Sequence, residues 1–488
     1  MNPADLKIES RNLIGGQWVG AADGRAFPVT DPATDRIIAH VPLCGAAEMR
    51  QAIDAAARAW PEWRSRTAQE RGDLLRALAA VMMRDQQRLA HLMTLEQGKP
   101  ITESRGEIAY AASFLDWAAE EGKRLYGETI PASHRDKRIL ILRQSIGVVA
   151  AITPWNFPSA MITRKLGPAL ACGNTFIVKP AEQTPLSAIA LGELAIQAGF
   201  PPGVINIITG DPQAIAGEIF SNATVRKVSF TGSTEVGRIL MRQAADHVVR
   251  LSLELGGHAP FIVFEDANID AAVAGAMASK FRNTGQTCVC ANRFFVHESV
   301  YEKFAAGFSR AMAALRIGAG FDENIHIGPL IDDDAVAKVQ GHVSDALDRG
   351  AKVRTGGDLV SVGAGYANRF FAPTLIDGFT GDMRLSNEET FGPVAPLRAF
   401  TSEDEAIALA NDSPYGLAAY FYTRDASRLM RVAEALEYGI VGANDGMPST
   451  AQAPFGGVKQ SGFGREGGRH VMHEYTSVKY ISWGLGNA

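Results

Sequence analysis

Apolar residues recur at helical spacing in the first part of the chain, between Glu48 and Gly98. Two series show this most clearly: Ile53, Ala56, Ala57 and Trp60, followed by Leu74, Leu75, Leu78 and Val81. Gly98-Lys99-Pro100 breaks the pattern, which resumes over residues 108–125. We therefore expect a helical N-terminal region, in which no residue indicates chemistry.

Between Val148 and Glu254 the pattern changes to short apolar runs that alternate with helix-like segments. The runs cover 148–152, 175–178, 204–208, 225–230 and 249–253. In one intervening segment, Thr184 is the expected helix N-cap and Pro185 the expected first helical residue. Alternating buried strands and helices predict a parallel sheet covered on both faces, with ligands at the carboxyl ends of its strands. This is a dinucleotide-binding architecture, although the sequence contains no GxGxxG motif.

A second α/β region follows Gly256 and extends to about Gly457. Strands are expected at 261–264, 293–297, 371–376 and 394–400, and helices at 271–281 and 300–315. The predicted fold class is therefore α/β, with a parallel Rossmann-type region followed by a second α/β region.

Two strand-prone segments fit neither region. Ile139-Leu140-Ile141-Leu142 follows a polar stretch around His134, and residues 478–483 form a second apolar strand near the C-terminus. A projecting apolar strand leaves an edge that a partner subunit usually covers. We expect a small β arm for oligomerisation, in a homodimer or a homotetramer.

The composition narrows the class of protein. Hydrophobic residues make up 46% of the 488 residues and charged residues 21%, as in globular proteins, and the net charge of −5 gives no basic surface for nucleic acid. Four cysteines are too few for a disulfide scaffold, and none has zinc-ligand spacing, so we expect no metal. With no signal peptide and no apolar run long enough for a membrane span, a cytoplasmic protein is expected.

Candidate chemistry begins at Gly285-Gln286-Thr287-Cys288-Val289-Cys290. Gly285 allows a tight turn that exposes a sulfur, and Arg282 adds a positive charge that would favour a thiolate. Taken alone, the two cysteines fit buried strand residues better. A second weak signal is Thr231-Gly232-Ser233-Thr234, a helix start whose free N–H groups could hold a pyrophosphate.

Seven short motifs, taken together in order, resemble the aldehyde dehydrogenase superfamily over nearly the whole chain. They begin at Thr153 (TPWNFP), Lys179 (KPAE), Phe230 (FTGS), Leu253 (LELGG), Gly285 (GQTC), Glu388 (EETFGP) and Pro454 (PFGG). The runs FRNTGQTCVC at Phe281 and MITRK at Met161 are most similar to the succinate-semialdehyde dehydrogenase branch. The resemblance implies that branch's fold, cofactor and reaction.

Four catalytic residues follow from this resemblance. Cys288 is the nucleophile that attacks the aldehyde carbon, and Asn156 and the Cys288 N–H stabilise the oxyanion. Glu254, between two leucines, should have a raised pKa and act as the base that hydrolyses the thioester. Lys165 relays protons, although a surface lysine is the alternative.

The resemblance also implies a site for NAD, with NADP possible. Its residues are Trp155, Lys179, Glu182, Gly232, Ser233, Leu255, Glu389 and Phe391. Lys179 and Glu182 match contacts to the adenosine ribose, and an acidic residue at that ribose favours NAD over NADP.

A distal carboxylate is the expected handle on the substrate. Arg164, Arg282 and Ser449 match the residues that bind this carboxylate in relatives, and arginine suits its planar geometry. Met447-Pro448 replaces the aliphatic pair that relatives generally carry before the serine. Glutarate semialdehyde, 2-oxoglutarate semialdehyde and a broader aldehyde range therefore stay open beside succinate semialdehyde.

The resemblance divides the chain into three parts. We expect a dinucleotide-binding domain at 1–126 and 147–256, a catalytic domain at 257–457, and an oligomerisation arm with the C-terminal tail at 127–146 and 458–488.

Three further questions are left open by the sequence. A CoA-acylating enzyme and a catalytically silent binding protein that kept the fold are the alternative functions. Cys290 is either a buried residue or the partner of Cys288 in a regulatory disulfide.

Overall fold

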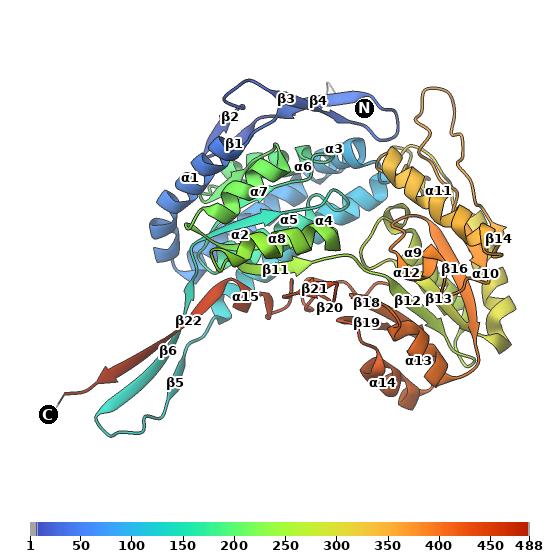
Figure 1. Cartoon of the computed structure of the whole chain (residues 1–488). Helices are drawn as coiled ribbons and strands as arrows, with labels where there is room; N and C mark the ends of the chain where they lie inside the picture. Colours follow the sequence, from blue (N-terminus) through green and yellow to red (C-terminus); the bar gives the residue numbers. More distant parts are fainter. Residues whose placement is uncertain (1–5, 7, 487–488) are drawn as a thin grey trace.

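The chain folds around two large sheets and a smaller sheet that projects from them (Figure 1). This computed structural model describes residue 6 and residues 8–486. Among these residues, none of the helices has the length and the apolar content that crossing a bilayer requires.

The N-terminal region is helical, as its apolar spacing predicts. Its helices are α1 (Ala46–Ser65), α2 (Ala68–Arg84), α3 (Gln86–Gln97) and α4 (Ile101–Glu121), followed by η2 (Gly122–Arg124). Thr67 and Glu70 start α2 with a reciprocal capping box, and Gly98 ends α3 in the left-handed conformation at φ +88°. The break at Gly98-Lys99-Pro100 therefore separates two helices that pack together.

The first large sheet has the strand order β2-β1-β9-β8-β7-β10-β11-β21. Its strands are β1 (Asn12–Ile14), β2 (Gln17–Val19), β7 (Val148–Ile152), β8 (Thr175–Lys179), β9 (Ile205–Ile207), β10 (Val225–Thr231), β11 (Arg250–Glu254) and β21 (Gly462–Phe463). The helices that follow its central strands are α5 (Ala160–Ala171), α6 (Leu186–Gln197), α7 (Pro212–Ser221) and α8 (Thr234–Ala245). Strands β7 to β11 are mutually parallel, which confirms the predicted sheet.

Helices cover both faces of this sheet. Val149 and Ala151 of β7 pack into the core that includes α2 and α4–α6, whereas Val148 and Ala150 pack into the core with α1, α7 and α8. In the register of the sheet, Ile152 pairs with Lys179 and Thr231 pairs with Glu254. These residues therefore lie at the same carboxyl edge, where ligands bind in sheets of this kind.

The start of α6 differs from the sequence prediction. Pro185, not Thr184, is the N-cap residue, and it makes no side-chain cap. Glu96 of α3 takes that role, because its carboxylate accepts the N–H groups of Leu186 and Ser187, both at 2.8 Å. A residue ninety positions away therefore supplies the cap that the local sequence lacks.

The second large sheet has the order β14-β15-β16-β13-β12-β18-β19. Its strands are β12 (Ala259–Val263), β13 (Ala291–His297), β14 (Lys352–Thr355), β15 (Thr374–Asp377), β16 (Val394–Phe400), β18 (Ala418–Tyr422) and β19 (Ile440–Ala443). The associated helices are α9 (Ile269–Phe281), η3 (Arg282–Gly285), η4 (Glu298–Val300), α10 (Tyr301–Ala313), α11 (Asp333–Asp348), α12 (Arg384–Asn387), α13 (Glu403–Asn411) and α14 (Ala426–Ala435). This sheet is also mainly parallel, so the second α/β region is confirmed.

The projecting sheet contains β5 (Glu128–Ile130), β6 (Lys137–Ser145) and β22 (Thr476–Gly484) (Figure 1). β6 and β22 pair antiparallel over nine residues, from Thr476↔Ser145 to Gly484↔Lys137. Val478, Tyr480 and Trp483 are about 60% exposed on this sheet. The two apolar segments that the sequence singled out thus form one extended arm.

The remaining elements are short. They are β3 (Ala26–Thr30), β4 (Ile37–Pro42), β17 (Tyr415–Gly416), β20 (Val458–Lys459) and α15 (Val471–Glu474). The glycine-rich segment that contains β20 and β21 is an ordered crossing between the sheets: Gly462 and Phe463 pair with Glu254 and Leu253 of β11.

Candidate active site

A cavity of about 330 Å³ contains Cys288. It is bounded by the carboxyl ends of β10 and β11, the turn before α5, and the loops that precede β13 and β16. Eight of the residues predicted from the sequence line it: Trp155, Asn156, Gly232, Ser233, Leu255, Cys288, Glu389 and Phe391. Residues from both large sheets thus meet at one hollow.

The turn before Cys288 holds an unusual backbone conformation. Asn283 and Thr284 have φ values of +50° and +58°, and Gly285 follows at +76°. Left-handed geometry at two successive non-glycine residues costs about 1–3 kcal/mol each, so surrounding contacts must hold it. Thr284 exchanges hydrogen bonds with the backbone of Gly328 at 3.1 and 3.2 Å, and a Cβ on Gly285 would lie 2.3 Å from Gly392 O.

The thiol of Cys288 is half-buried and protonated at neutral pH in this state. Burial raises its pKa to about 12, and the negative charge of Glu389 adds to the shift, while Arg164 opposes it. The positive charge of Arg282, which we expected to favour a thiolate, is a smaller influence than burial. A base must therefore remove the Cys288 proton when the sulfur reacts.

Asn156 is fixed by its backbone and its side chain. Its carbonyl accepts a hydrogen bond from the ammonium of Lys99 at 2.6 Å, and its Nδ2 donates to Gln286 O at 3.0 Å. One amide hydrogen is left over, because an asparagine side chain carries two. The Oδ1 atom is buried and has no hydrogen-bond partner among the described residues.

Glu254 ends β11 as a buried carboxyl group without hydrogen bonds. Neither carboxyl oxygen has a partner in the part of the chain that the structure describes. Burial raises its pKa well above the usual range, and the nearby negative charge of Glu466 raises it further. The raised pKa agrees with the prediction for this residue.

Lys165 and Arg164 share one counter-ion, Glu466. Lys165 forms an ion pair with Glu466 and donates to Thr231 Oγ1 at 2.5 Å, and it is completely buried. The alternative that Lys165 is a surface lysine is therefore wrong. Arg164 Nε lies 3.0 Å from the second Glu466 oxygen, and its guanidinium stacks between Phe114 and Phe455.

This pairing corrects one argument from the sequence. From the resemblance we expected both Arg164 and Arg282 to bind the distal carboxylate of the substrate. Arg164 has the negative charge of Glu466 beside it, which lies 302 positions later in the chain, so sequence proximity gave no sign of it; its Nε and Nη2 atoms make no hydrogen bond to the described residues. Arg282 fits the expectation better: it makes no ion pair with any described residue, and it lies over the ring of Phe157 at 4.9 Å.

Arg282 and Ser449 lie at a second, narrower space. Together with Met447 and Pro448 they line a cavity of about 10 Å³ that also touches Thr287 and Val289 on either side of Cys288. Arg164 does not line it. The structure therefore brings two of the three predicted tail-binding residues together and leaves the third with Glu466.

The predicted cofactor residues form two groups. Ser233 is the N-cap of α8, Trp155 and Phe391 stand edge to face at 5.6 Å, and all three line the Cys288 cavity. Lys179 and Glu182 form an ion pair at the end of β8, outside the residues that line that cavity. The side chain of Glu182 is 42% exposed, so it can reach a ligand that extends along this edge.

Glu389 accepts the N–H of Gly257 at 3.1 Å. Burial raises its pKa to about 7. A Cβ on Gly256 would lie 3.0 Å from the other carboxyl oxygen of Glu389, so the glycine keeps this part of the cavity open.

Sequence reasoning missed three charged residues next to the site: Lys99, Glu103 and Glu107. Lys99 and Glu107 form a buried ion pair at 2.5 Å, and Glu103 accepts the N–H of Asn283 at 2.7 Å. The spacing held a usable signal, because Glu103 and Glu107 are four residues apart, which places both carboxylates on one face of the helix.

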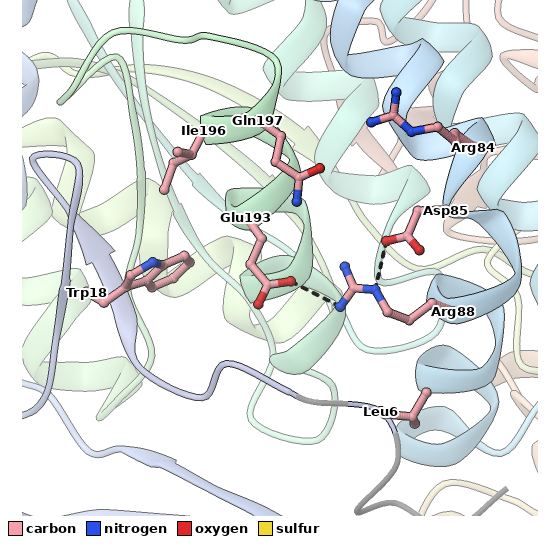
Figure 2. Close-up of a pocket in the computed structure, with 8 residues that line it drawn as sticks. All are labelled: Leu6, Trp18, Arg84, Asp85, Arg88, Glu193, Ile196 and Gln197. Atoms are coloured by element: carbon pink, nitrogen blue, oxygen red, sulfur yellow. Dashed lines mark hydrogen bonds and ion pairs between the residues drawn. The ribbon is translucent and has the colours of Figure 1, made fainter.

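A wider hollow of about 700 Å³ lies elsewhere, between α2, α3 and α6 (Figure 2). There Arg88 bonds to Asp85 at 2.7 Å and to Glu193 at 3.0 Å. This hollow and the Cys288 cavity have no lining residue in common.

Known proteins resemble this chain over its full extent. The aldehyde dehydrogenase family matches residues 18–481. A protein of Escherichia coli K12 named succinate-semialdehyde dehydrogenase (NADP+) is 57% identical over 99% of this chain and 100% of its own. A glutarate-semialdehyde dehydrogenase of Pseudomonas aeruginosa is 54% identical, with the same coverage.

A solved structure gives the same result for the fold. The crystal structure of an E. coli NADP-dependent enzyme superposes with a TM-score of 0.97 at 56% identity, over 99% of this chain and 100% of that one. The match to the family model and the high identity to these relatives show that the protein is a member of the aldehyde dehydrogenase family and an NAD(P)-dependent enzyme, and the half-buried thiol of Cys288 and the Asn156 amide share its cavity between the two sheets.

Proposed function

We propose that the protein oxidises a semialdehyde with a distal carboxylate, succinate semialdehyde in first place, to the dicarboxylic acid. The observation that carries this proposal is Arg282, a guanidinium without an ion-pair partner in the described chain, which lines a narrow space with Ser449 beside the Cys288 loop. A buried or half-buried cation of this kind suits a bidentate carboxylate. The names of the two relatives above support the same substrate class.

The cavity suits a dinucleotide. The free N–H groups at the start of α8 and the Ser233 hydroxyl can hold a phosphate, and Glu389 and Phe391 border the space for the nicotinamide end. Lys179 and Glu182 would contact the adenosine ribose. When it is bound, NAD(P) supplies the acceptor for the hydride that leaves the substrate.

The protein's own groups account for the first half of the reaction. The Cys288 sulfur attacks the aldehyde carbon once a base has taken its proton. The carbonyl oxygen gains negative charge, which the free Asn156 amide hydrogen and the backbone N–H of Cys288 stabilise. Each such donor is worth about 3–4 kcal/mol in the transition state.

Glu254 is the base in the second half of the reaction, the hydrolysis of the thioester. Loss of hydride leaves a thioester on Cys288, and hydrolysis needs a base that deprotonates water. Glu254 has two oxygens without hydrogen bonds to the described protein, and its raised pKa brings it nearer to the range of a general base. Lys165 and Glu466, a buried pair whose charges act on Glu254, would receive the proton that Glu254 takes up.

We infer that the substrate's chain length depends on the loop 447–449. Pro448 restricts the backbone of this loop next to Arg282 and Ser449, so the loop would set how long a tail reaches them. Glutarate semialdehyde is the second candidate, because a relative with that name is 54% identical.

The proposed function also assigns a role to each of the two domains and to the projecting arm. The first sheet would hold the cofactor, at 1–126 and 147–256, and the second would carry the catalytic cysteine, at 257–457. The exposed apolar side chains of β22 would be covered in a cytoplasmic homodimer or homotetramer, with the arm at 127–146 and the tail at 458–488.

An assay of NAD(P) reduction over matched aldehydes tests the substrate class. Succinate semialdehyde and glutarate semialdehyde are compared with butanal and pentanal, which have similar lengths but no carboxylate. We expect kcat/KM to be at least about 10-fold higher for the carboxylated member of each pair, from a charge-assisted bond of roughly 1.5–3 kcal/mol. Equal values within the pairs would contradict the proposal.

A further inference from the structure

Two buried charges and one half-buried charge lie behind the two turns of the active site. Lys99, Glu103 and Glu107 come from the end of the break after α3 and from the first turns of α4. None of them lines the Cys288 cavity. Their contacts nevertheless converge on the segments that carry Asn156 and Cys288.

The first contact holds the Asn156 turn. The ammonium of Lys99 lies between Glu107 Oε2 at 2.5 Å and the carbonyl of Asn156 at 2.6 Å, and it packs 4.0 Å from the centre of the Phe157 ring. The other oxygen of Glu107 accepts the N–H groups of Ser159 and Ala160 at 2.9 and 3.2 Å. Glu107 therefore caps α5, whose own N-cap side chain makes no such bond.

The second contact holds the cysteine turn. Glu103 Oε2 accepts the N–H of Asn283 at 2.7 Å, at the first of the two left-handed residues. The side chain of Asn283 donates to the carbonyl of Asn156 at 3.1 Å, on the oxygen that also binds Lys99. One carbonyl thus joins the turn of the oxyanion donor to the turn of the nucleophile.

We propose that Lys99, Glu103 and Glu107 form a brace, a set of positioning residues that fixes the Asn156 turn and the Cys288 turn relative to each other. The brace touches no reacting atom. It acts through the Asn156 carbonyl, the first turn of α5 and the Asn283 N–H, and so sets the distance between nucleophile and oxyanion donor.

Simple packing would not require these residue types. Burying Lys99 and Glu107 and half-burying Glu103 in a helical interface costs more than placing apolar residues of the same volume there. In return, their bonds have fixed directions, and the acceptors and donors they meet belong to segments 52 to 180 positions away in the sequence. Reacting groups need placement within about 0.5 Å, which directional bonds achieve.

The experiment compares Glu103→Met with Glu103→Gln in the full-length protein. Methionine keeps the volume but cannot accept the Asn283 N–H, whereas glutamine keeps an acceptor oxygen. We expect Glu103→Met to lower kcat by about 10- to 100-fold, with KM and the Kd for NAD within about threefold. Glu103→Gln should recover kcat to within about threefold of the parent.

Lys99→Met tests the other turn, and Glu120→Met is the matched control. Glu120 lies on α4 with Glu103 and Glu107, but it pairs at the surface with Arg76 and Lys123. The kcat of Glu120→Met should therefore equal that of the parent. Lys99→Met should lower kcat by about 10- to 100-fold. If it does not fold, the Glu103 pair alone decides, since glutamine must restore what methionine removes.

Two outcomes would overturn the brace. One is a folded Glu103→Met enzyme with the kcat of the parent. The other is an equal loss in Glu103→Met and Glu103→Gln, because that would tie the effect to charge and not to position. The assays use succinate semialdehyde and butanal in parallel. Loss of the brace should lower kcat for both substrates, so a failure of the brace proposal can be told apart from a failure of the carboxylate preference.

Discussion

Glu254 and Glu107 are both buried glutamates of the active-site region, yet their surroundings are opposite. Both oxygens of Glu254 lack a hydrogen-bond partner in the described chain. Glu107 has Lys99 on one oxygen and two backbone N–H groups on the other. A buried polar group without partners costs stability, so the protein retains it only where it serves another purpose. The comparison separates the carboxyl group that is free to react from the one that holds the structure.

Replacing Cys288 gives the largest expected effect on the reactive side. Cys288→Ala should abolish dehydrogenase turnover, because the covalent step needs the sulfur. NAD binding should change little, since the cavity keeps its other lining residues. NADH formation and calorimetric titration with NAD measure the two properties; residual turnover would point to a different nucleophile.

Glu254→Gln tests the unpaired carboxyl group directly. We expect a burst of about one NADH per active site followed by near-arrest, because the thioester forms but is not hydrolysed. In the parent, steady-state kcat should rise with pH, since the raised pKa of Glu254 means that more base forms as pH increases. Stopped-flow and pH profiles check this, and steady turnover by the variant would remove Glu254 from the role of base.

The two glutamates should differ in the opposite sense in their effect on stability: we expect Glu107→Gln to destabilise the fold more than Glu254→Gln. Glu107→Gln leaves the buried Lys99 without its counter-ion and should lower the free energy of unfolding by about 3 kcal/mol. Glu254→Gln removes no hydrogen bond to the described chain and should leave that free energy unchanged or slightly higher. Chemical denaturation followed by fluorescence measures both, and equal losses would end the distinction.

The two arginines allow the same comparison for cations. Arg282→Ala should raise KM for succinate semialdehyde by about 10- to 100-fold and leave butanal unaffected. Arg164→Ala should reduce activity on both, because it also removes a counter-ion from Glu466 next to Lys165. Parallel KM measurements decide; an Arg282→Ala enzyme that loses both activities would contradict its assignment to the substrate tail.

The smallest effect is expected at the cofactor's ribose. The 2′-phosphate of NADP would lie near the Glu182 carboxylate, and two negative charges at about 4 Å repel by up to about 4 kcal/mol at an intermediate dielectric. Lys179 pairs with Glu182 and offsets part of this repulsion. The parent should therefore prefer NAD moderately, and Glu182→Ser should narrow the gap by improving kcat/KM with NADP. A parent that prefers NADP would show that Glu182 does not contact the ribose.

The fold and the residues that line the cavity could be predicted from the sequence, because short local motifs indicate them. Glu254 ends a strand, Ser233 begins a helix, and Cys288 follows a glycine turn, so each motif includes the element that positions it. The brace was missed for the opposite reason: Glu103 and Glu107 share a helix face, but Asn283, the partner of Glu103, is 180 positions away and resembles an ordinary loop residue. The pairing of Arg164 with Glu466 escaped in the same way.

The structure bears on whether Cys290 can form a regulatory disulfide with Cys288. The thiol of Cys290 is fully buried and donates to the carbonyl of Lys280 at 3.3 Å, and both cysteines of the loop are free. A bond to Cys288 would first require this segment to rearrange.

The crossing segment near the C-terminus has a consequence for synthesis. Glu466 neutralises Lys165, and β21 covers the edge of β11 at Glu254, yet both come from the last part of the chain to be translated. A growing chain therefore carries the cysteine, the amide and the base well before their environment exists. A chain cut before residue 462 would leave the edge of β11 unpaired and Lys165 without Glu466, so we expect it to be unstable and inactive.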